Sequence, residues 1–217
     1  MSRARLVFAV AALAGALSAA GPALALQAPR KPPAPRPPAA KAPPAPRPAE
    51  PPVAPGTEAV VETARGAFTI RLLPDLAPEH ARLFVKTAKA GGYDGTTFHR
   101  VIAGGIIQGG DPLSKDAAKA AQYGTGGLGL LKAEFSDRPF VRSTVAAVRR
   151  PSSRDSAGTQ FFVVVNDQPA LQGQFTIFGE VVSGMEVVDQ ISLTPVEGDR
   201  AKERVEMKVT IRPPAVP

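Results

Sequence analysis

Residues 93–112 read Tyr93-Asp-Gly-Thr-Thr-Phe-His-Arg-Val-Ile-Ala-Gly-Gly-Ile-Ile-Gln-Gly-Gly-Asp-Pro112. Because successive side chains of a strand point to opposite faces, an extended segment here places Phe98, Arg100 and Ile102 on one face. An arginine between apolar residues is costly to bury on such a face unless it meets water or a partner. We therefore expect Arg100 to face solvent or a bound molecule.

A second informative segment is Gln160-Phe-Phe-Val-Val164. As a strand it places Gln160 and Phe162 on one face, and Phe161 and Val163 on the opposite face. Apolar residues on both faces, together with one glutamine, predict a core on one side of this strand and an apolar groove on the other.

Short runs of β-type residues, broken by Gly, Pro and Asp, make up most of the chain after residue 56. Eight runs are expected to be strands: 59–63, 67–72, 97–102, 106–108, 145–148, 160–165, 176–182 and 204–211. Pro78 suits a first helical position, and a helical spacing of apolar residues follows it until Gly91. Residues 184–191 are expected to form a second helix. Eight short strands at this length favour a barrel or a sandwich.

The composition excludes several classes of function. The chain of 217 residues contains no Cys and only two His, so thiolate chemistry and the usual His and Cys zinc sites are not expected, and no cofactor is expected. Seven of the 26 basic residues and one of the 19 acidic residues precede Gly56. The remaining 19 basic and 18 acidic residues give residues 56–217 a net charge of +1, which does not indicate a nucleic-acid binder.

Residues 124–129 match the dinucleotide fingerprint G-x-G-x-x-G. That fingerprint binds a pyrophosphate only between a strand and a helix, and neither flank here has the required pattern. A glycine-rich surface loop is the better interpretation.

The N-terminal part divides into two segments. Residues 1–25 carry Arg3 and Arg5, an apolar run and a small-x-small cleavage site ending at Ala25, which is typical of a secretory signal peptide. An uncleaved membrane anchor is the alternative. Residues 26–55 are rich in Pro, Ala and basic residues, and we expect an extended, disordered linker. This arm is either a solvated tether or a weak contact to anionic envelope surfaces. Residues 56–217 are expected to form one domain.

Four motifs follow one another in the order found in one family. They are Phe98-His-Arg-Val-Ile-x-Gly-x-x-Ile-Gln-Gly-Gly-Asp111, Gly124-Thr-Gly-Gly127, Ser156-Ala-Gly-Thr-Gln-Phe-Phe162 and Phe178-Gly-Glu-Val181. By these motifs residues 59–211 resemble the cyclophilins, peptidyl-prolyl cis-trans isomerases, in their bacterial exported form. The resemblance implies an all-β fold: a closed, eight-stranded antiparallel barrel with two capping helices.

The resemblance also implies roles for individual residues. Arg100 would be the catalytic arginine, and Gln108 and Gln160 would orient the substrate backbone. The implied substrate-binding residues are Ile106, Phe162 and Leu171, which would wall the proline pocket, together with Phe98 and Phe175. No metal is implied. His99 is expected to be structural, because rotation about a peptide bond needs no base.

Several positions depart from the family pattern. Gly105 stands where cyclophilins usually have a phenylalanine of the proline pocket, and Ala170 where they have an aromatic residue at its rim. Losing a buried aromatic contact costs about 1.5 to 3 kcal/mol of substrate affinity. We expect a working but weaker enzyme. The segment 112–123 is longer than the corresponding segment of compact members. We expect it to form an insertion beside the groove.

The leading hypothesis is therefore a prolyl isomerase, located in the periplasm, that assists the folding of exported proteins by binding extended proline-containing segments. The alternative is a proline-peptide binding module or holdase chaperone with little turnover. A monomer is expected, and no nucleic-acid partner.

Overall fold

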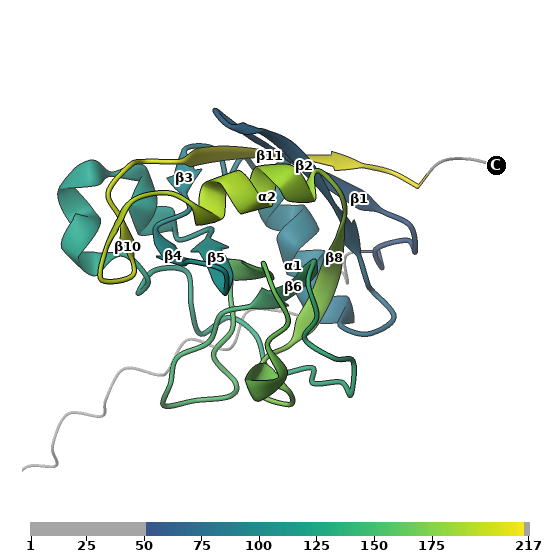
Figure 1. The fold of residues 1–217 in the computed structure, drawn as a ribbon. Coiled ribbons are helices and arrows are strands. Elements are labelled where there is room, and N and C mark those ends of the chain that lie inside the picture. Colours follow the sequence, from purple (N-terminus) through teal and green to yellow (C-terminus); the bar gives the residue numbers. More distant parts are fainter. Residues whose placement is uncertain (1–50, 215–217) are drawn as a thin grey trace, which may run out of the picture. The chain divides into compact units, whose positions relative to one another are not determined.

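The computed structural model describes residues 51–214, so the predicted signal peptide and most of the predicted linker lie outside the described residues. The fold is all-β, with one curled sheet whose strand pairs are antiparallel (Figure 1). Its strands are β1 (Glu58–Thr63), β2 (Gly66–Leu72), β3 (Thr96–Thr97), β4 (Arg100–Ile102), β5 (Ile106–Gly109), β6 (Thr144–Ala147), β7 (Phe161–Val164), β8 (Ile177–Ser183), β9 (Val196–Glu197), β10 (Arg200–Ala201) and β11 (Glu206–Arg212).

The finer expectation of a closed, eight-stranded barrel is not confirmed by the strand pairing. The described part of the chain forms 11 strands in the order β3-β11-β1-β2-β8-β6-β7-β5-β4-β10-β9, which has β3 and β9 at its two ends. The expected strand 97–102 is divided, because Phe98 and His99 belong to neither β3 nor β4. The short strands β9 and β10 have no clear signal in the sequence.

Helix α1 (Pro78–Lys89) begins with Pro78 and buries Ala81, Phe84 and Ala88. Proline suits the first turn because its missing N–H would have no helical partner there. The N-cap residue Ala77 offers no side-chain acceptor. Glu134 supplies one instead, since its carboxylate accepts from the backbone N–H of Glu79 at 3.2 Å and of His80 at 3.1 Å. A distant loop therefore caps this helix and places a negative charge at its positive end.

Helix α2 (Met185–Ser192) follows Gly184, whose φ of 81° lies in the left-handed region. A Cβ at Gly184 would lie 2.5 Å from the carbonyl oxygen of Ala67, so glycine is required by both conformation and space. The helix packs on β2, β4 and β5, and buries Val187, Val188 and Ile191.

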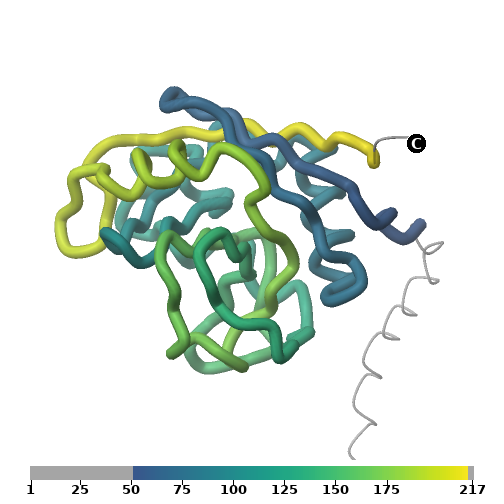
Figure 2. The backbone as a smooth tube through the Cα atoms, turned by 45° about the vertical axis from the view of Figure 1, so that its right-hand side comes forward, coloured from purple at the N-terminus to yellow at the C-terminus, as the bar shows by residue number. Residues whose placement is uncertain are grey.

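One apolar core contains buried residues from both helices and from most of the strands. The Phe84 ring lies 4.9 Å from the Tyr93 ring and 5.6 Å from the Phe161 ring, between centroids. Val53, from the segment that the sequence assigns to the linker, also packs against this core. The long connections coloured green gather on one side of the sheet, away from β11 (Figures 1 and 2). The sheet thus curls around the core and leaves its other face to these loops.

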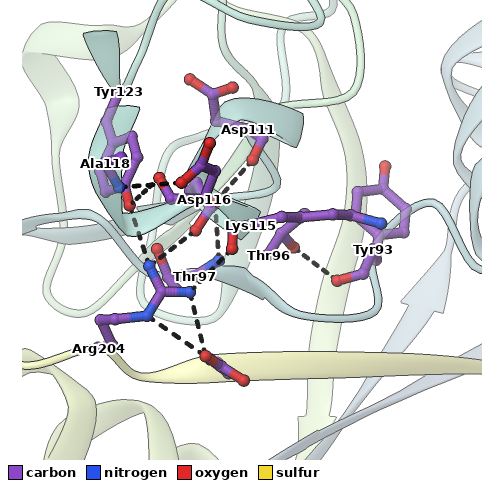
Figure 3. A network of polar contacts seen from close by, with 11 residues as sticks. Tyr93, Thr96, Thr97, Asp111, Lys115, Asp116, Ala118, Tyr123 and Arg204 are labelled. Atoms are coloured by element: carbon purple, nitrogen blue, oxygen red, sulfur yellow. Dashed lines mark hydrogen bonds and ion pairs between the residues drawn. The ribbon is translucent and has the colours of Figure 1, made fainter. Parts of the chain in front are cut away.

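The insertion expected at 112–123 forms two short 3-10 helices, η1 (Pro112–Lys115) and η2 (Ala117–Gln122). Arg204 connects them to the rest of the domain by hydrogen bonds. Its Nη1 donates to the Ser114 carbonyl at 3.0 Å and to the Tyr123 hydroxyl at 2.9 Å (Figure 3). The Tyr123 hydroxyl in turn donates to the Asp116 carbonyl at 2.9 Å. The insertion is therefore an ordered part of the domain.

Both histidines are buried with one ring nitrogen that has no partner in the described chain. The Nδ1 of His80 lies 2.5 Å from Glu134 Oε2, and the Nδ1 of His99 lies 3.4 Å from the Thr97 carbonyl oxygen. Both Nε2 atoms are buried without a hydrogen-bond partner among residues 51–214. Protonation would leave an unsatisfied N–H there. Burial accordingly lowers the pKa of both histidines, although Glu134 and Asp111 act in the opposite direction.

Acidification from pH 7 to pH 5 is expected to reduce the free energy of unfolding. Unfolded histidines titrate near pH 6.5, whereas the folded pKa of His80 and of His99 is lower, so below pH 6.5 the unfolded chain binds more protons. Each such proton removes about 1.4 kcal/mol of stability per pH unit until the folded histidine titrates. Urea unfolding at pH 7, 6 and 5 measures the slope, and His80→Gln and His99→Gln should each flatten it. A wild-type stability that does not change over this range would contradict the prediction.

Candidate active site

The register of three neighbouring strands brings the predicted polar residues together. Arg100 of β4 pairs with Gln108 of β5, and Gln108 pairs with Phe162 of β7. Directly paired residues of antiparallel strands point to the same face. The arginine, the amide and the aromatic ring therefore form one row across the sheet, on the face opposite the main core.

Side-chain hydrogen bonds connect this row to the loops beneath it. Arg100 Nη1 donates to Gln108 Oε1 at 3.3 Å, and Gln108 Nε2 donates to Gln160 Oε1 at 3.0 Å. Gln160 Nε2 donates to the Gly126 carbonyl at 2.7 Å and lies 3.4 Å from Asp111 Oδ2. Each amide both accepts and donates, so the orientation of one fixes that of the next.

Asp111 closes this chain of hydrogen bonds from below. Its fully buried carboxylate accepts from the backbone N–H of Leu113 at 2.8 Å and of Gly124 at 2.6 Å. A Cβ at Gly126 would lie 2.3 Å from Asp111 Oδ1, so only glycine allows this close approach. The glycines of the apparent dinucleotide motif thus pack against a carboxylate, which is incompatible with a pyrophosphate site there.

Asp199 is a partner of Arg100 that the sequence did not indicate. It lies between β9 and β10, and its Oδ2 is 2.6 Å from Arg100 Nε. The pairing of Arg200 with Arg100 across β10 and β4 brings it there. The hydrogen bond from Arg100 is the main cause that lowers the pKa of Asp199. Asp199 therefore remains ionised and holds the guanidinium by its Nε, while Nη2 has no hydrogen-bond partner among the described residues.

The apolar half of the site is a second cluster on the same face. Phe162, Ile106 and Val164 are buried in it, and Leu171 and Phe175 pack against it with part of their surface exposed. The Phe162 and Phe175 rings meet edge to face at 5.3 Å between centroids. A cavity of about 320 Å³ opens beside these rings. Its lining residues are Arg100, Ile102, Gly105, Ile106, Gln108, Val148, Arg149, Pro151, Phe162, Gln168, Leu171 and Phe175.

The structure thus brings together seven of the eight predicted site residues. Six line the cavity, and Gln160 lies beneath it, fully buried and bonded to Gln108. Phe98 is the exception. Its side chain is 0% exposed and belongs to the main core, with its ring 6.1 Å from that of Phe161. The expectation that Phe98 contacts substrate is wrong, because the backbone is irregular at 98–99 and the strict alternation assumed for 97–102 does not apply.

Two departures from the family pattern have visible effects on the cavity. Gly105 lines it without a side chain, and a Cβ there would lie 2.9 Å from Ile102 Cγ2. The side chain of Ile102 therefore occupies part of the space beside it. No residue of the insertion 112–123 lines the cavity, although we expected this segment beside the groove. Arg149, for which the sequence assigned no role, does line it.

Among residues 51–214 no group of three or more His, Cys, Asp or Glu side chains is placed to hold a metal ion. Over the same residues no helix is both long and apolar enough to cross a membrane.

Comparison with known proteins agrees with the geometry of the site. Residues 59–212 match the family model described as cyclophilin type peptidyl-prolyl cis-trans isomerase/CLD. A probable peptidyl-prolyl cis-trans isomerase of Brucella suis is 43% identical over 142 residues, which cover 63% of this chain and 72% of that protein. Peptidyl-prolyl cis-trans isomerase B of Bacillus subtilis is 41% identical over 137 residues, which cover 62% of this chain and 87% of that protein.

A solved structure supports the fold independently. The cyclophilin-type isomerase of Cryptosporidium parvum, crystallised in the presence of the dipeptide Ala-Pro, has a TM-score of 0.64 at 24% identity and covers 71% of this chain and 98% of its own. With the family model matching more than two thirds of the sequence, the chain belongs to the cyclophilin-type peptidyl-prolyl cis-trans isomerases.

Proposed function

We propose that this isomerase acts on extended, proline-containing segments of exported proteins, with Arg100 as the catalytic residue and the apolar cavity as the proline pocket. The observation that carries the assignment is the fixed guanidinium beside that cavity, held by Asp199 at Nε and by Gln108 at Nη1. An apolar slot with one directed donor suits a proline ring whose amide must rotate. The Ala-Pro dipeptide present with the Cryptosporidium structure is consistent with such a ligand.

The chemistry follows from the electronic structure of the amide. Rotation about an X-Pro bond passes through a twisted state that has lost resonance, at a barrier of about 18–20 kcal/mol. In that state the proline nitrogen becomes pyramidal and recovers a lone pair. A donor on Arg100 can then form a hydrogen bond that neither planar form can accept, so the enzyme binds the transition state more tightly than the ground states. Neither proton transfer nor a covalent intermediate is required.

The two glutamines have separate roles in this proposal. Gln108 lines the cavity, so its amide is placed to contact the substrate backbone while it orients Arg100. Gln160 is fully buried and bonded to Gln108 and to the Gly126 carbonyl, so it acts as a positioning residue. Ile106, Phe162, Leu171 and Phe175 supply apolar surface for the proline ring.

Replacing Arg100 with alanine is expected to lower kcat/KM for an X-Pro peptide by about 10²- to 10³-fold, the usual cost of removing one transition-state donor. The measurement is the relaxation of the cis fraction in a protease-coupled assay. Arg71→Ala is the matched control: Arg71 lies on β2, pairs only loosely with carboxylates at 3.7 and 3.8 Å, and does not line the cavity. If the wild type itself leaves the peptide relaxing at the spontaneous rate, the chain is a binding module and not a working isomerase.

One observation favours the alternative function, a proline-peptide binding module with little turnover: residue 105 is a glycine and adds no side chain to the cavity. Its φ does not lie in the left-handed region, so a larger residue is compatible with the backbone, but Ile102 stands in the way. Gly105→Phe in an Ile102→Ala background is expected to raise kcat/KM by about tenfold over Ile102→Ala alone, because a buried ring contributes about 1.5 kcal/mol or more. Equal rates for the two variants would show that the absent ring does not limit turnover.

The exported role rests on the sequence of residues 1–25 and on no structural observation. We propose that the chain is cleaved after Ala25 and works in the periplasm as a folding catalyst with chaperone character. Mass spectrometry of the protein from an envelope fraction is expected to show an N-terminus at Leu26. A chain that retains Met1 and sediments with membranes would instead identify an uncleaved anchor, and one that retains Met1 in the cytoplasm would contradict export.

A further inference from the structure

A second guanidinium lines the cavity, and it is held rigidly. Arg149 follows β6, and its Cζ lies 5.0 Å from the centroid of the Phe175 ring. Its Nε donates to the Gln174 carbonyl at 2.8 Å, and its Nη1 lies 3.1 Å from the Arg150 carbonyl oxygen. An arginine stacked on an aromatic ring and fixed by carbonyls loses little further entropy when it binds a ligand.

This second cation has no compensating carboxylate. Across residues 51–214, the contacts of Arg149 are with carbonyl oxygens and the Phe175 ring, and none is with an acidic side chain. Arg100, by contrast, is paired with Asp199 at 2.6 Å. The cavity lining contains two arginines and no acidic residue. The unbalanced positive charge at the site is therefore concentrated at Arg149.

The neighbouring residues reinforce this charge. Arg150 contacts the Leu128 carbonyl at 3.5 Å, and the Cζ of Arg154 lies 5.5 Å from the Phe135 ring. Neither forms an ion pair within the part of the chain that the structure describes. Asp155 follows Arg154 and accepts the backbone N–H of Ala133 at 3.0 Å, and it forms no ion pair with these arginines among residues 51–214. The segment 149–154 thus carries three arginines and no acidic residue, and of these arginines Arg149 lines the cavity.

We propose that Arg149 makes the site selective for X-Pro segments that carry a carboxylate side chain within two residues of the proline. The inference rests on the proposed function and specifies its substrate class. A cavity of about 320 Å³ is roughly 7 Å across, which is the span of about two extended residues. An acidic side chain at that distance from a proline ring seated on Phe162 reaches the Nη2 of Arg149, which has no partner among the described residues.

The experiment compares matched peptides in a protease-free NMR exchange assay. Each peptide contains one proline and either Glu or Gln at one of four positions, two or one before the proline and one or two after it. The wild type is expected to show a Glu to Gln ratio of kcat/KM of about 5 at one or more positions at low salt, as for a favourable half-exposed ion pair. The ratio should fall toward 1 in 0.5 M salt, because the attraction is screened.

Three variants identify the residue responsible. Arg149→Gln is expected to bring the ratio to about 1, and Arg149→Lys to retain part of it, whatever happens to the overall rate. Arg154→Gln removes the same charge from the same loop but does not line the cavity, and it should keep the wild-type ratio.

The possible outcomes separate this inference from the proposed function. A wild type that isomerises the Gln peptides with a ratio of 1 at all four positions overturns the selectivity and leaves the isomerase assignment intact. A ratio that persists in Arg149→Gln, or disappears in Arg154→Gln, assigns the selectivity to net charge and overturns the role of Arg149. Failure to isomerise any peptide contradicts the proposed function itself.

Discussion

The antiparallel register of β4, β5 and β7 is the constraint on which the site depends. It places Arg100, Gln108 and Phe162 side by side on one face of the sheet, with no loop between them. A shift of one residue in either pairing would turn these side chains into the core and bring core residues to the surface. The buried hydrogen bonds from Gln108 to Gln160 and from Gln160 to the Gly126 carbonyl then fix the loop that contains Gly126 against these strands. Because Arg100, Gln108 and Phe162 lie on strands, the sheet fixes the positions of their backbones.

The two faces of β7 contact different parts of the molecule: one packs in the main core and the other lies under the cavity. Phe161 and Val163 pack in the core that the sheet surrounds, whereas Phe162 and Val164 belong to the smaller cluster under the cavity. This second cluster needs the long loops to cover it, and Phe175 and Leu171 are supplied by the connection that precedes β8. An incompletely covered apolar face is normally a liability. In this protein the uncovered part is the cavity proposed as the proline pocket.

The sequence predicted this arrangement where a residue's neighbours along the chain determine its environment. Alternation in 160–164 correctly separated core from groove, and the family motifs identified the three polar residues at the site. Alternation failed at Phe98, where the chain leaves the strand for two residues. The sequence also did not predict the contacts of Asp199 and Arg149, and the reason is different from that at Phe98. Asp199 reaches Arg100 through a strand pair that joins residues about a hundred positions apart, and Arg149 is defined by a ring contact with Phe175. Neither relation leaves a local pattern.

The pairing of β1 with β11 has a consequence for how the domain is made. Within residues 51–214 β1 is the first strand and β11 the last, yet they lie side by side from Glu58 opposite Arg212 to Thr63 opposite Met207 (Figure 1). A chain that is synthesised from its N-terminus therefore leaves one edge of β1 unpaired until β11 has emerged from the ribosome. An open strand edge is a template for aggregation, and such long-range closure is slow. The ladder between β1 and β11 can therefore form only after the whole domain has been synthesised.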